Sequence, residues 1–190
     1  MKRHIVLLAA ILALPSLPAM ADGHKDGHKK AGKSGKTASV TVRSLNEQGT
    51  GNSIGSIKLK EVTGGIVLTP DLRDLTPGLH GFHVHENGSC EPSTKDGKVT
   101  PGGAAGGHLN LDDAKHHAAP WEDGHTGDMP ALFVKENGTA THPVFAPGLT
   151  MKAVKDKAII IHAGGDNYSD SPKPLGGGGA RVACGIIPGK

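Results

Sequence analysis

Long apolar runs and cysteine are both scarce in this sequence. Beyond the N-terminus no stretch is long and apolar enough for a transmembrane helix, so we expect a chain without a membrane span. The only two cysteines are Cys90 and Cys184. In an exported protein such a pair favours a disulfide over a redox or metal-binding pair, with two buried free thiols as the alternative. Closing so long a loop would stabilise the fold by about 4 to 5 kcal/mol.

The first 21 residues are typical of a secretory signal peptide. Lys2 and Arg3 form a basic head, and residues 5–14 form an apolar run too short to span a bilayer. The segment Ala19-Met20-Ala21 has the small-x-small pattern of a cleavage site. We therefore predict export and a mature chain that starts at Asp22.

Residues 22–37 form a tail rich in lysine and histidine. Because they contain no apolar residue larger than alanine, we expect them to be disordered and the folded domain to cover residues 38–190. The signal and the tail carry all of the basic surplus behind the net charge of +3, and the remainder is slightly acidic. This balance gives no support to a nucleic-acid partner. His24 and His28 could form an accessory metal-binding site, and a merely solubilising tail is the alternative.

Helix signals are weak after the tail, and short β-branched or alternating runs prevail. Turn residues separate these runs, for example at 49–52, 69–71 and 76–78, and Asn137-Gly138 predicts a hairpin. The expected strands cover residues 40–43, 53–59, 65–68, 81–85, 130–134, 139–145, 157–162 and 180–187. The pattern predicts an all-β fold, an antiparallel eight-stranded β-sandwich or flattened barrel. Two long segments, 86–129 and 163–179, are predicted to be functional loops.

A His-x-His pair, His83 and His85, stands in the expected strand 81–85. Side chains of a strand alternate between its two faces, so this spacing puts both imidazoles on one face. Further potential metal ligands follow downstream, namely His108, His117, His125, Asp128 and His162. Six histidines and one aspartate are too many for a single tetrahedral ion. They fit two adjacent metal ions that share a ligand.

The potential ligands divide by their setting. Imidazole suits copper and zinc, and zinc also accepts a carboxylate. His117, His125 and Asp128 lie on one loop, and His108 would complete a closed tetrahedron typical of zinc. The other three histidines lie on or beside strands and would hold a second ion. His108 could serve both ions as an imidazolate, with one ring nitrogen for each.

Together these motifs resemble the bacterial, periplasmic copper-zinc superoxide dismutases over residues 38–190. Besides the His117, His125 and Asp128 series, the resemblance rests on Gly-Phe-His-Val-His-Glu-Asn at 81–87, Gly-Gly-His-Leu at 106–109, His-Ala-Gly-Gly-Asp-Asn at 162–167 and Gly-Gly-Ala-Arg-Val-Ala-Cys-Gly at 178–185. Several independent motifs in the family's order make the match specific. The resemblance implies that the sandwich has Greek-key topology.

The resemblance also implies a role for each residue, with one copper and one zinc ion per subunit. Copper would be bound by His83, His85, His108 and His162. Zinc would be bound by His108, His117, His125 and Asp128, where the spacing of bacterial relatives favours His117 over its neighbour His116. Asp166 would link a copper-binding histidine to a zinc-binding one, Cys90 and Cys184 would form the family disulfide, and Arg181 would meet the substrate anion.

The implied activity is the dismutation of superoxide to oxygen and hydrogen peroxide. Copper would cycle between Cu(II) and Cu(I), zinc would be structural, and His108 would take up a proton and hand it to the forming peroxide. The alternative is a non-catalytic periplasmic copper or zinc carrier, which would need the ligands but neither Arg181 nor Asp166. Relatives occur as dimers and as monomers, so a homodimer stays open. Trp121 could be an interface anchor or a loop packing residue.

Overall fold

The computed structural model describes residues 35–189 of the chain. The predicted signal peptide, and residues 22–34 of the predicted tail with His24 and His28, lie outside the described residues. The first strand begins at Thr37, one residue before the expected start of the domain. Among the residues that the structure describes, no helix is long and apolar enough to cross a membrane.

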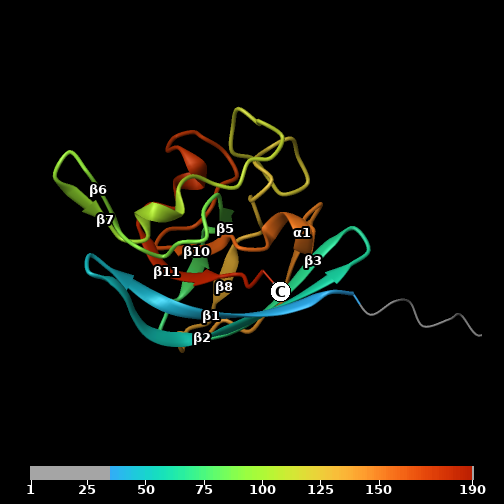
Figure 1. Ribbon diagram of the computed structural model, residues 1–190, viewed down its shortest axis with the longest axis horizontal. Helices are drawn as coiled ribbons and strands as arrows, with labels where there is room; N and C mark the ends of the chain where they lie inside the picture. The colour runs from blue at the N-terminus through green and yellow to red at the C-terminus, as the bar shows by residue number, and fades with distance from the viewer. Residues whose placement is uncertain (1–34, 190) are drawn as a thin grey trace, which may run out of the picture. The chain divides into compact units, whose positions relative to one another are not determined.

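Strands dominate the described part of the chain, and only one short α-helix interrupts them (Figure 1). The strands are β1 Thr37–Asn46, β2 Gly49–Val62, β3 Gly65–Leu72, β4 Gly78–His80, β5 Phe82–His85, β6 Ser93–Lys95, β7 Lys98–Thr100, β8 Leu132–Val134, β9 Val144–Pro147, β10 Ala158–His162 and β11 Arg181–Ile186; the helix is α1 Met151–Val154. All strand pairs are antiparallel.

Seven strands form one curled sheet in the order β5-β10-β11-β1-β2-β3-β9, and β4 pairs with β8 in a second, two-stranded sheet. In Figure 1 the strands β1 and β2 form a lower layer, with β5, β10 and β11 above it. Strands far apart in sequence are neighbours, since β5 pairs with β10 and β3 pairs with β9. The predicted all-β antiparallel Greek-key sandwich is confirmed.

The alternation of side chains explains how the core and the histidines share strands. On β5, Phe82 and Val84 point into the apolar core and are no more than 1% exposed. His83 and His85 therefore project from the opposite face of the same strand. They too are buried, because long loops cover that face. Strand β10 repeats the pattern, with Ile159 and Ile161 in the core.

At Asn137-Gly138 the predicted turn is present, but the predicted hairpin is not. A tight turn does form there, and the Lys135 N–H donates to the Thr139 carbonyl at 2.8 Å. The flanking strands, however, do not pair with each other, because β8 pairs with β4 and β9 pairs with β3. After the turn, Ala140 exchanges both backbone hydrogen bonds with Leu72 at 3.0 and 3.1 Å. The chain thus crosses to the other sheet instead of returning along β8.

Two predicted turns, 49–52 and 69–71, lie inside strands β2 and β3. The turn between β1 and β2 is shorter and contains only Glu47 and Gln48. Pro70 fits into β3 because the ladder between β3 and β9 ends at Leu68. The N–H of Leu72, two residues on, points to the same side. The N–H that Pro70 lacks would therefore face the interval between the Leu68–Val144 pair and the Leu72–Ala140 pair, where β3 has no ladder partner.

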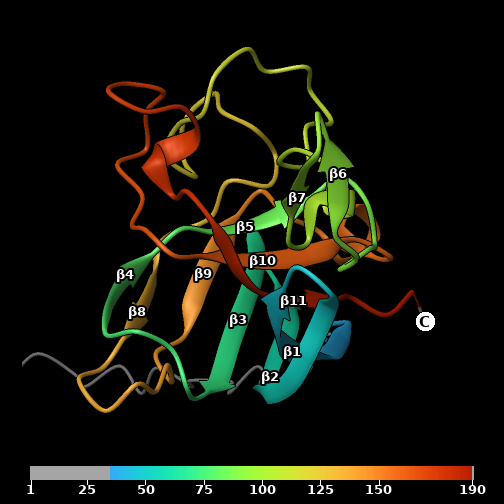
Figure 2. The same cartoon turned by 90° about the vertical axis from the view of Figure 1, so that its left-hand side faces the viewer.

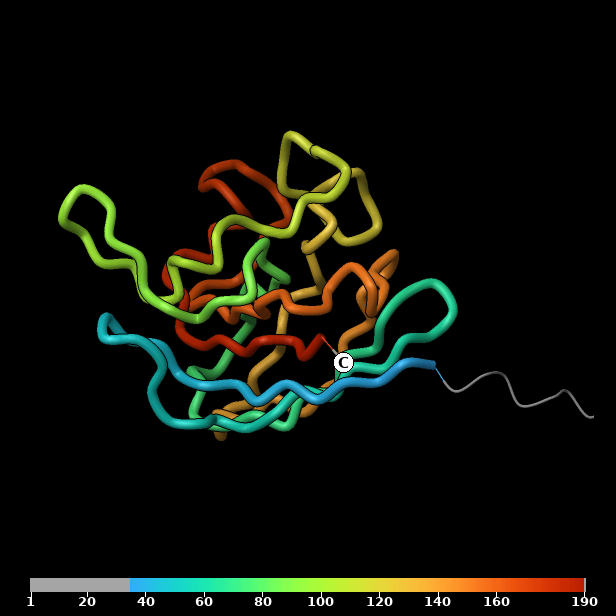
Figure 3. The backbone as a smooth tube through the Cα atoms, viewed as in Figure 1, coloured from blue at the N-terminus to red at the C-terminus, as the bar shows by residue number. Residues whose placement is uncertain are grey.

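The long loop 86–129 contains a small hairpin, β6–β7, that the sequence reading missed. Its side chains are almost all exposed, so it has no alternation of apolar and polar residues. The one local signal is Asp96-Gly97, whose φ angles of 52° and 74° suit a tight hairpin turn. Figures 2 and 3 show this hairpin projecting from the loop region above the sandwich.

Both long loops, 86–129 and 163–179, lie at the same end of the sandwich (Figure 2). The predicted disulfide between Cys90 and Cys184 is confirmed, with the two Cα atoms 5.7 Å apart. It ties the start of the first loop to strand β11. Cys90 and Cys184 also form a small apolar cluster with Ala105, Ala158 and Ile160, separate from the main core. The loops are thus fixed to the sandwich at a covalent anchor.

Candidate metal centre

Strand β5 positions the first two histidines, and a loop segment attached to its edge positions a third. The Leu109 N–H donates to the Val84 carbonyl at 2.8 Å, and the Glu86 N–H donates to the Gly107 carbonyl at 3.0 Å. These bonds place His108, which lies between Gly107 and Leu109, opposite His85. The loop acts locally as an additional strand beside β5.

Four histidines converge on the face of β5 that looks away from the core. His83 and His85 come from β5, His108 from the attached loop and His162 from the end of β10. One ring nitrogen from each lies within 4.8 Å of the corresponding nitrogens of the others. All four residues are at most 6% exposed. We call them the four-histidine group, and it contains the residues predicted to bind copper.

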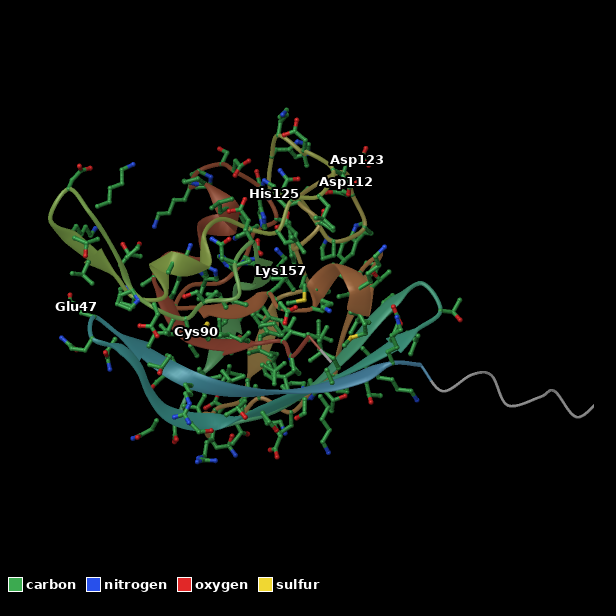
Figure 4. The ribbon with its side chains drawn as sticks, viewed as in Figure 1. Glu47, Cys90, Asp112, Asp123, His125 and Lys157 are labelled. Carbon is green, nitrogen blue, oxygen red and sulfur yellow. A yellow bond between two sulfur atoms is a disulfide. The ribbon has the colours of Figure 1, made fainter. Side chains whose placement is uncertain are left out.

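A second cluster shares His108 with the first. It consists of His108, His117, His125 and Asp128, whose potential ligand atoms also lie within 4.8 Å of one another. Asp128 Oδ1 lies 2.7 Å from His108 Nδ1 and 3.0 Å from His117 Nδ1. His125 lies on the long loop, at the top in Figure 4. We call these residues the histidine–aspartate group, and they are those predicted to bind zinc.

The neighbouring histidines 116 and 117 differ clearly in their environment. His117 is 2% exposed and belongs to the histidine–aspartate group, whereas His116 is exposed to solvent. His80, another buried histidine, lies outside both groups. Its two ring nitrogens contact the carbonyls of His162 and Thr76 at 2.6 and 2.7 Å, so its role is structural.

Six buried ring nitrogens have no hydrogen-bond partner in residues 35–189. They are His83 Nδ1, His85 Nε2, His108 Nε2, His117 Nδ1, His125 Nδ1 and His162 Nε2. A buried polar atom without a partner costs about 1–3 kcal/mol, so six in one place call for a ligand. Each of them belongs to one of the two groups. Imidazoles alone suit copper, and imidazoles with a carboxylate suit zinc, so both donor sets fit their predicted ions.

Burial keeps the four-histidine group neutral at physiological pH. Loss of solvation is the main cause that lowers the pKa of His85 to about 2, of His162 to about 3 and of His108 to about 4. Burial also lowers the pKa of His83, against the opposing effect of Asp166. Neutral imidazoles present the lone pairs that a metal ion needs.

Asp166 joins the two groups. One carboxylate oxygen accepts a hydrogen bond from His83 Nε2 at 2.7 Å, and the other accepts one from His117 Nε2 at 2.8 Å. Its side chain is fully buried. Because the Nε2 atoms donate these hydrogen bonds, Nδ1 is the atom by which the neutral rings of His83 and His117 can bind a metal ion. Asp166 therefore has the linking position that the resemblance implied.

Arg181, the first residue of β11, is partly buried beside the four-histidine group. Its guanidinium donates to the carbonyls of Gly102 and Gly106, both at 2.6 Å. The Gly106 carbonyl also accepts a hydrogen bond from His85 Nδ1 at 3.0 Å. One carbonyl thus orients both the guanidinium and the imidazole. The segment that supplies it is anchored by the Cys90–Cys184 disulfide and its apolar cluster.

Two positioning features were missed from the sequence. Asp170 accepts the backbone N–H of His117, and nothing in its serine-flanked setting marks it out. Gly127 passes so close to β5 that a Cβ atom would overlap the Val84 carbonyl. A glycine beside a potential ligand, Asp128, was the only signal of such a close approach.

Comparison with known proteins agrees with this geometry. The family model described as copper/zinc superoxide dismutase (SODC) matches residues 53–187. The chain belongs to the copper/zinc superoxide dismutase family. The copper-zinc superoxide dismutase of Photobacterium leiognathi is 60% identical over 149 residues, covering 78% of this chain and 86% of that protein.

Solved structures of superoxide dismutases have the same fold. The Cu/Zn superoxide dismutase from Brucella abortus superimposes with a TM-score of 0.78 at 45% identity, covering 80% of this chain and 99% of that one. The monomeric copper, zinc superoxide dismutase from Salmonella enterica has a TM-score of 0.73 at 51% identity, with the same coverage. The family relationship therefore extends over nearly the whole of these proteins.

Gly176 should be far less tolerant of a side chain than its neighbour Gly177. Both have positive φ, 70° and 74°. A Cβ atom on Gly176 would overlap Asp166 Oδ1 and lie 2.8 Å from His117 Nε2, whereas one on Gly177 would meet only Lys173 at 3.7 Å. We expect Gly176→Ala to weaken zinc binding roughly 10- to 100-fold, because it disturbs a hydrogen bond that orients His117. Gly177→Ala carries the same backbone strain and is the matched control. Equal zinc affinities of the two variants, measured by chelator competition, would contradict this reading.

Zinc binding to the metal-free protein should release a proton near neutral pH, and copper binding should not. Burial disfavours the charged form of His117, but the neighbouring carboxylates of Asp128 and Asp166 outweigh burial and raise the pKa of His117 to about 9. Below pH 9 zinc must displace that proton, so its affinity should rise up to tenfold per unit from about pH 6 to 8. The pKa values of the four-histidine group are lowered, so copper meets no such competition. Calorimetric titrations in buffers of different ionisation enthalpy measure the released protons, and equal release by both ions would refute the prediction.

Proposed function

We propose that this protein catalyses the dismutation of superoxide with one copper and one zinc ion per subunit. Two superoxide anions and two protons give oxygen and hydrogen peroxide. The observation that carries the proposal is the set of six unpartnered, buried ring nitrogens, which divide into two groups with His108 in common. We assign copper to the four-histidine group, and zinc to the histidine–aspartate group.

When bound, copper supplies one-electron chemistry between Cu(II) and Cu(I), and zinc supplies a fixed positive charge without a redox change. The protein's own residues do the rest. His108 faces both groups, and its Nε2 is the atom to which we assign the uptake of a proton that is later passed to the peroxide.

Arg181 is the residue to which we assign binding of the superoxide anion. A guanidinium stays charged at physiological pH even though burial lowers the pKa of Arg181. Two carbonyls hold it in a fixed direction, and it is partly exposed beside His85 and His162. A fixed positive charge beside the four-histidine group concentrates a small anion there and raises its rate of association.

A non-catalytic metal carrier on the same fold is the second candidate. A carrier would need the two ligand groups but would gain nothing from a guanidinium held beside one of them. It would also gain nothing from a buried carboxylate that links the two groups. The placement of Arg181 and Asp166 therefore favours the enzyme.

The location and assembly of the enzyme complete the proposal. The basic, apolar and small-x-small pattern of residues 1–21 supports export to the periplasm through a cleaved signal peptide.

The side chains of Leu79 and Phe133, on paired strands β4 and β8, are 58% and 45% exposed. Such a face supports a homodimer, which sedimentation of the mature chain would distinguish from a monomer.

We also propose that His24 and His28 of the tail recruit copper when the metal is scarce, since histidine-bearing tracts bind Cu(II). A mature chain that lacks residues 22–34 should then load copper more slowly from a limiting supply. Its final copper content and activity in excess copper should match those of the complete mature chain. Identical loading of both chains at limiting copper would end this proposal.

Substitution of Arg181 should separate catalysis from metal binding. We expect Arg181→Glu, loaded with both metals, to lose about 10²- to 10³-fold in the rate of superoxide decay, because it replaces a fixed cation with a repelling charge. Arg181→Lys keeps the charge without the fork of donors and should lose less. Decay is measured in native and variant proteins at equal metal content. If superoxide decays no faster with the fully loaded native protein than with its metal-free form, the protein is instead a carrier.

A further inference from the structure

Asp170 connects the two long loops through its side chain. One carboxylate oxygen accepts the backbone N–H of His117 at 3.0 Å, and the other accepts the N–H of Leu175 at 2.9 Å. His117 lies in the loop 86–129, whereas Asp170 and Leu175 lie in the loop 163–179. Hydrogen bonds to an ionised carboxylate are stronger than those between neutral groups. Asp170 therefore fixes the backbone of one loop against the other.

His117 has three polar contacts in the metal-free chain. Its Nε2 donates to Asp166 at 2.8 Å, its Nδ1 lies 3.0 Å from Asp128 Oδ1, and its backbone N–H donates to Asp170. The hydrogen bond with Asp166 orients the ring within the histidine–aspartate group. Only the third acts on the main chain, and the main chain decides which way a side chain points. This matters because His116, one residue earlier, carries the same imidazole and faces solvent.

We propose that Asp170 is a positioning residue for zinc, which fixes the register in which His117, and not His116, turns its ring into the histidine–aspartate group. The inference rests on the proposed assignment of zinc to that group and goes one step beyond it. A carboxylate without a contact to the ion would decide which of two adjacent histidines binds it.

Other contacts between the loops remain when Asp170 is replaced. The Tyr168 hydroxyl accepts the N–H of Ala131 at 3.0 Å, the Trp121 and Tyr168 rings lie 6.1 Å apart, and Asp166 still bridges the groups. The loss of Asp170 should therefore displace His117 locally without releasing the whole loop. This makes its substitution a specific probe of the register.

The test is zinc affinity of the metal-free protein, measured by competition with a chelator. Asp170→Asn keeps the size of the side chain but offers an oxygen to only one of the two N–H groups. We expect it to weaken zinc binding about 10- to 100-fold, as for other residues that orient a ligand. Asp113→Asn removes an exposed carboxylate of the zinc-binding loop whose recorded partner is Lys115, and it should bind zinc within about twofold of the native chain. Copper affinity should be the same in both variants, because His117 is not in the four-histidine group.

Cobalt and a double variant report on the register itself. Co(II) placed in the zinc site has visible absorption that depends on its ligands, and Asp170→Ala should change that spectrum while Asp113→Asn should not. His116→Ala should leave zinc binding unchanged in the native chain, yet weaken it further when combined with Asp170→Ala. A spectrum and a zinc affinity equal to those of the native protein in both Asp170 variants would overturn the inference.

His117→Ala distinguishes failure of the inference from failure of the proposed function. If this variant loses tight zinc binding while Asp170→Asn binds zinc like the native chain, the positioning role is wrong and the zinc assignment stands. If the native chain binds no zinc tightly, the zinc assignment fails and the role of Asp170 fails with it.

Discussion

Six imidazole nitrogens buried without hydrogen-bond partners are the constraint on which the rest of this structure depends. No compact fold would collect so many lone pairs away from water unless something replaces the lost solvation. Two metal ions that share His108 do so, since each unpartnered nitrogen then gains a bond. The ordered loops follow from the same constraint, because the ligands of each ion come from segments far apart in the chain.

The sandwich and the loops contribute differently to this centre. Strands β5 and β10 provide rigid positions for three of the histidines, and their other faces are embedded in the apolar core. The loops have few apolar residues of their own, and they are fixed by the Cys90–Cys184 disulfide and by the carboxylates of Asp166 and Asp170. A covalent link and hydrogen bonds to carboxylates thus replace hydrophobic packing where the chemistry requires polar side chains.

Much of this could be predicted from the sequence, for identifiable reasons. The period of two in a strand was sufficient to place His83 and His85 on one face, and the small number of cysteines pointed to a single disulfide. Pairing between strands was harder, because Asn137-Gly138 specifies a turn but does not specify which sheet the chain joins after it. Asp170 was not found, since its contact spans 53 residues and depends on how two irregular loops meet. Local patterns contain no information of that kind.

The shared ligand is the most direct point at which to test the whole interpretation. The measurement is a crystal structure of the protein loaded with copper and zinc, with anomalous diffraction recorded at both absorption edges. We predict one copper peak bounded by the four-histidine group and one zinc peak bounded by the histidine–aspartate group, with the His108 ring between them and one nitrogen facing each ion. A single peak, or two peaks with His108 bound to only one of them, would contradict the proposed bridged centre.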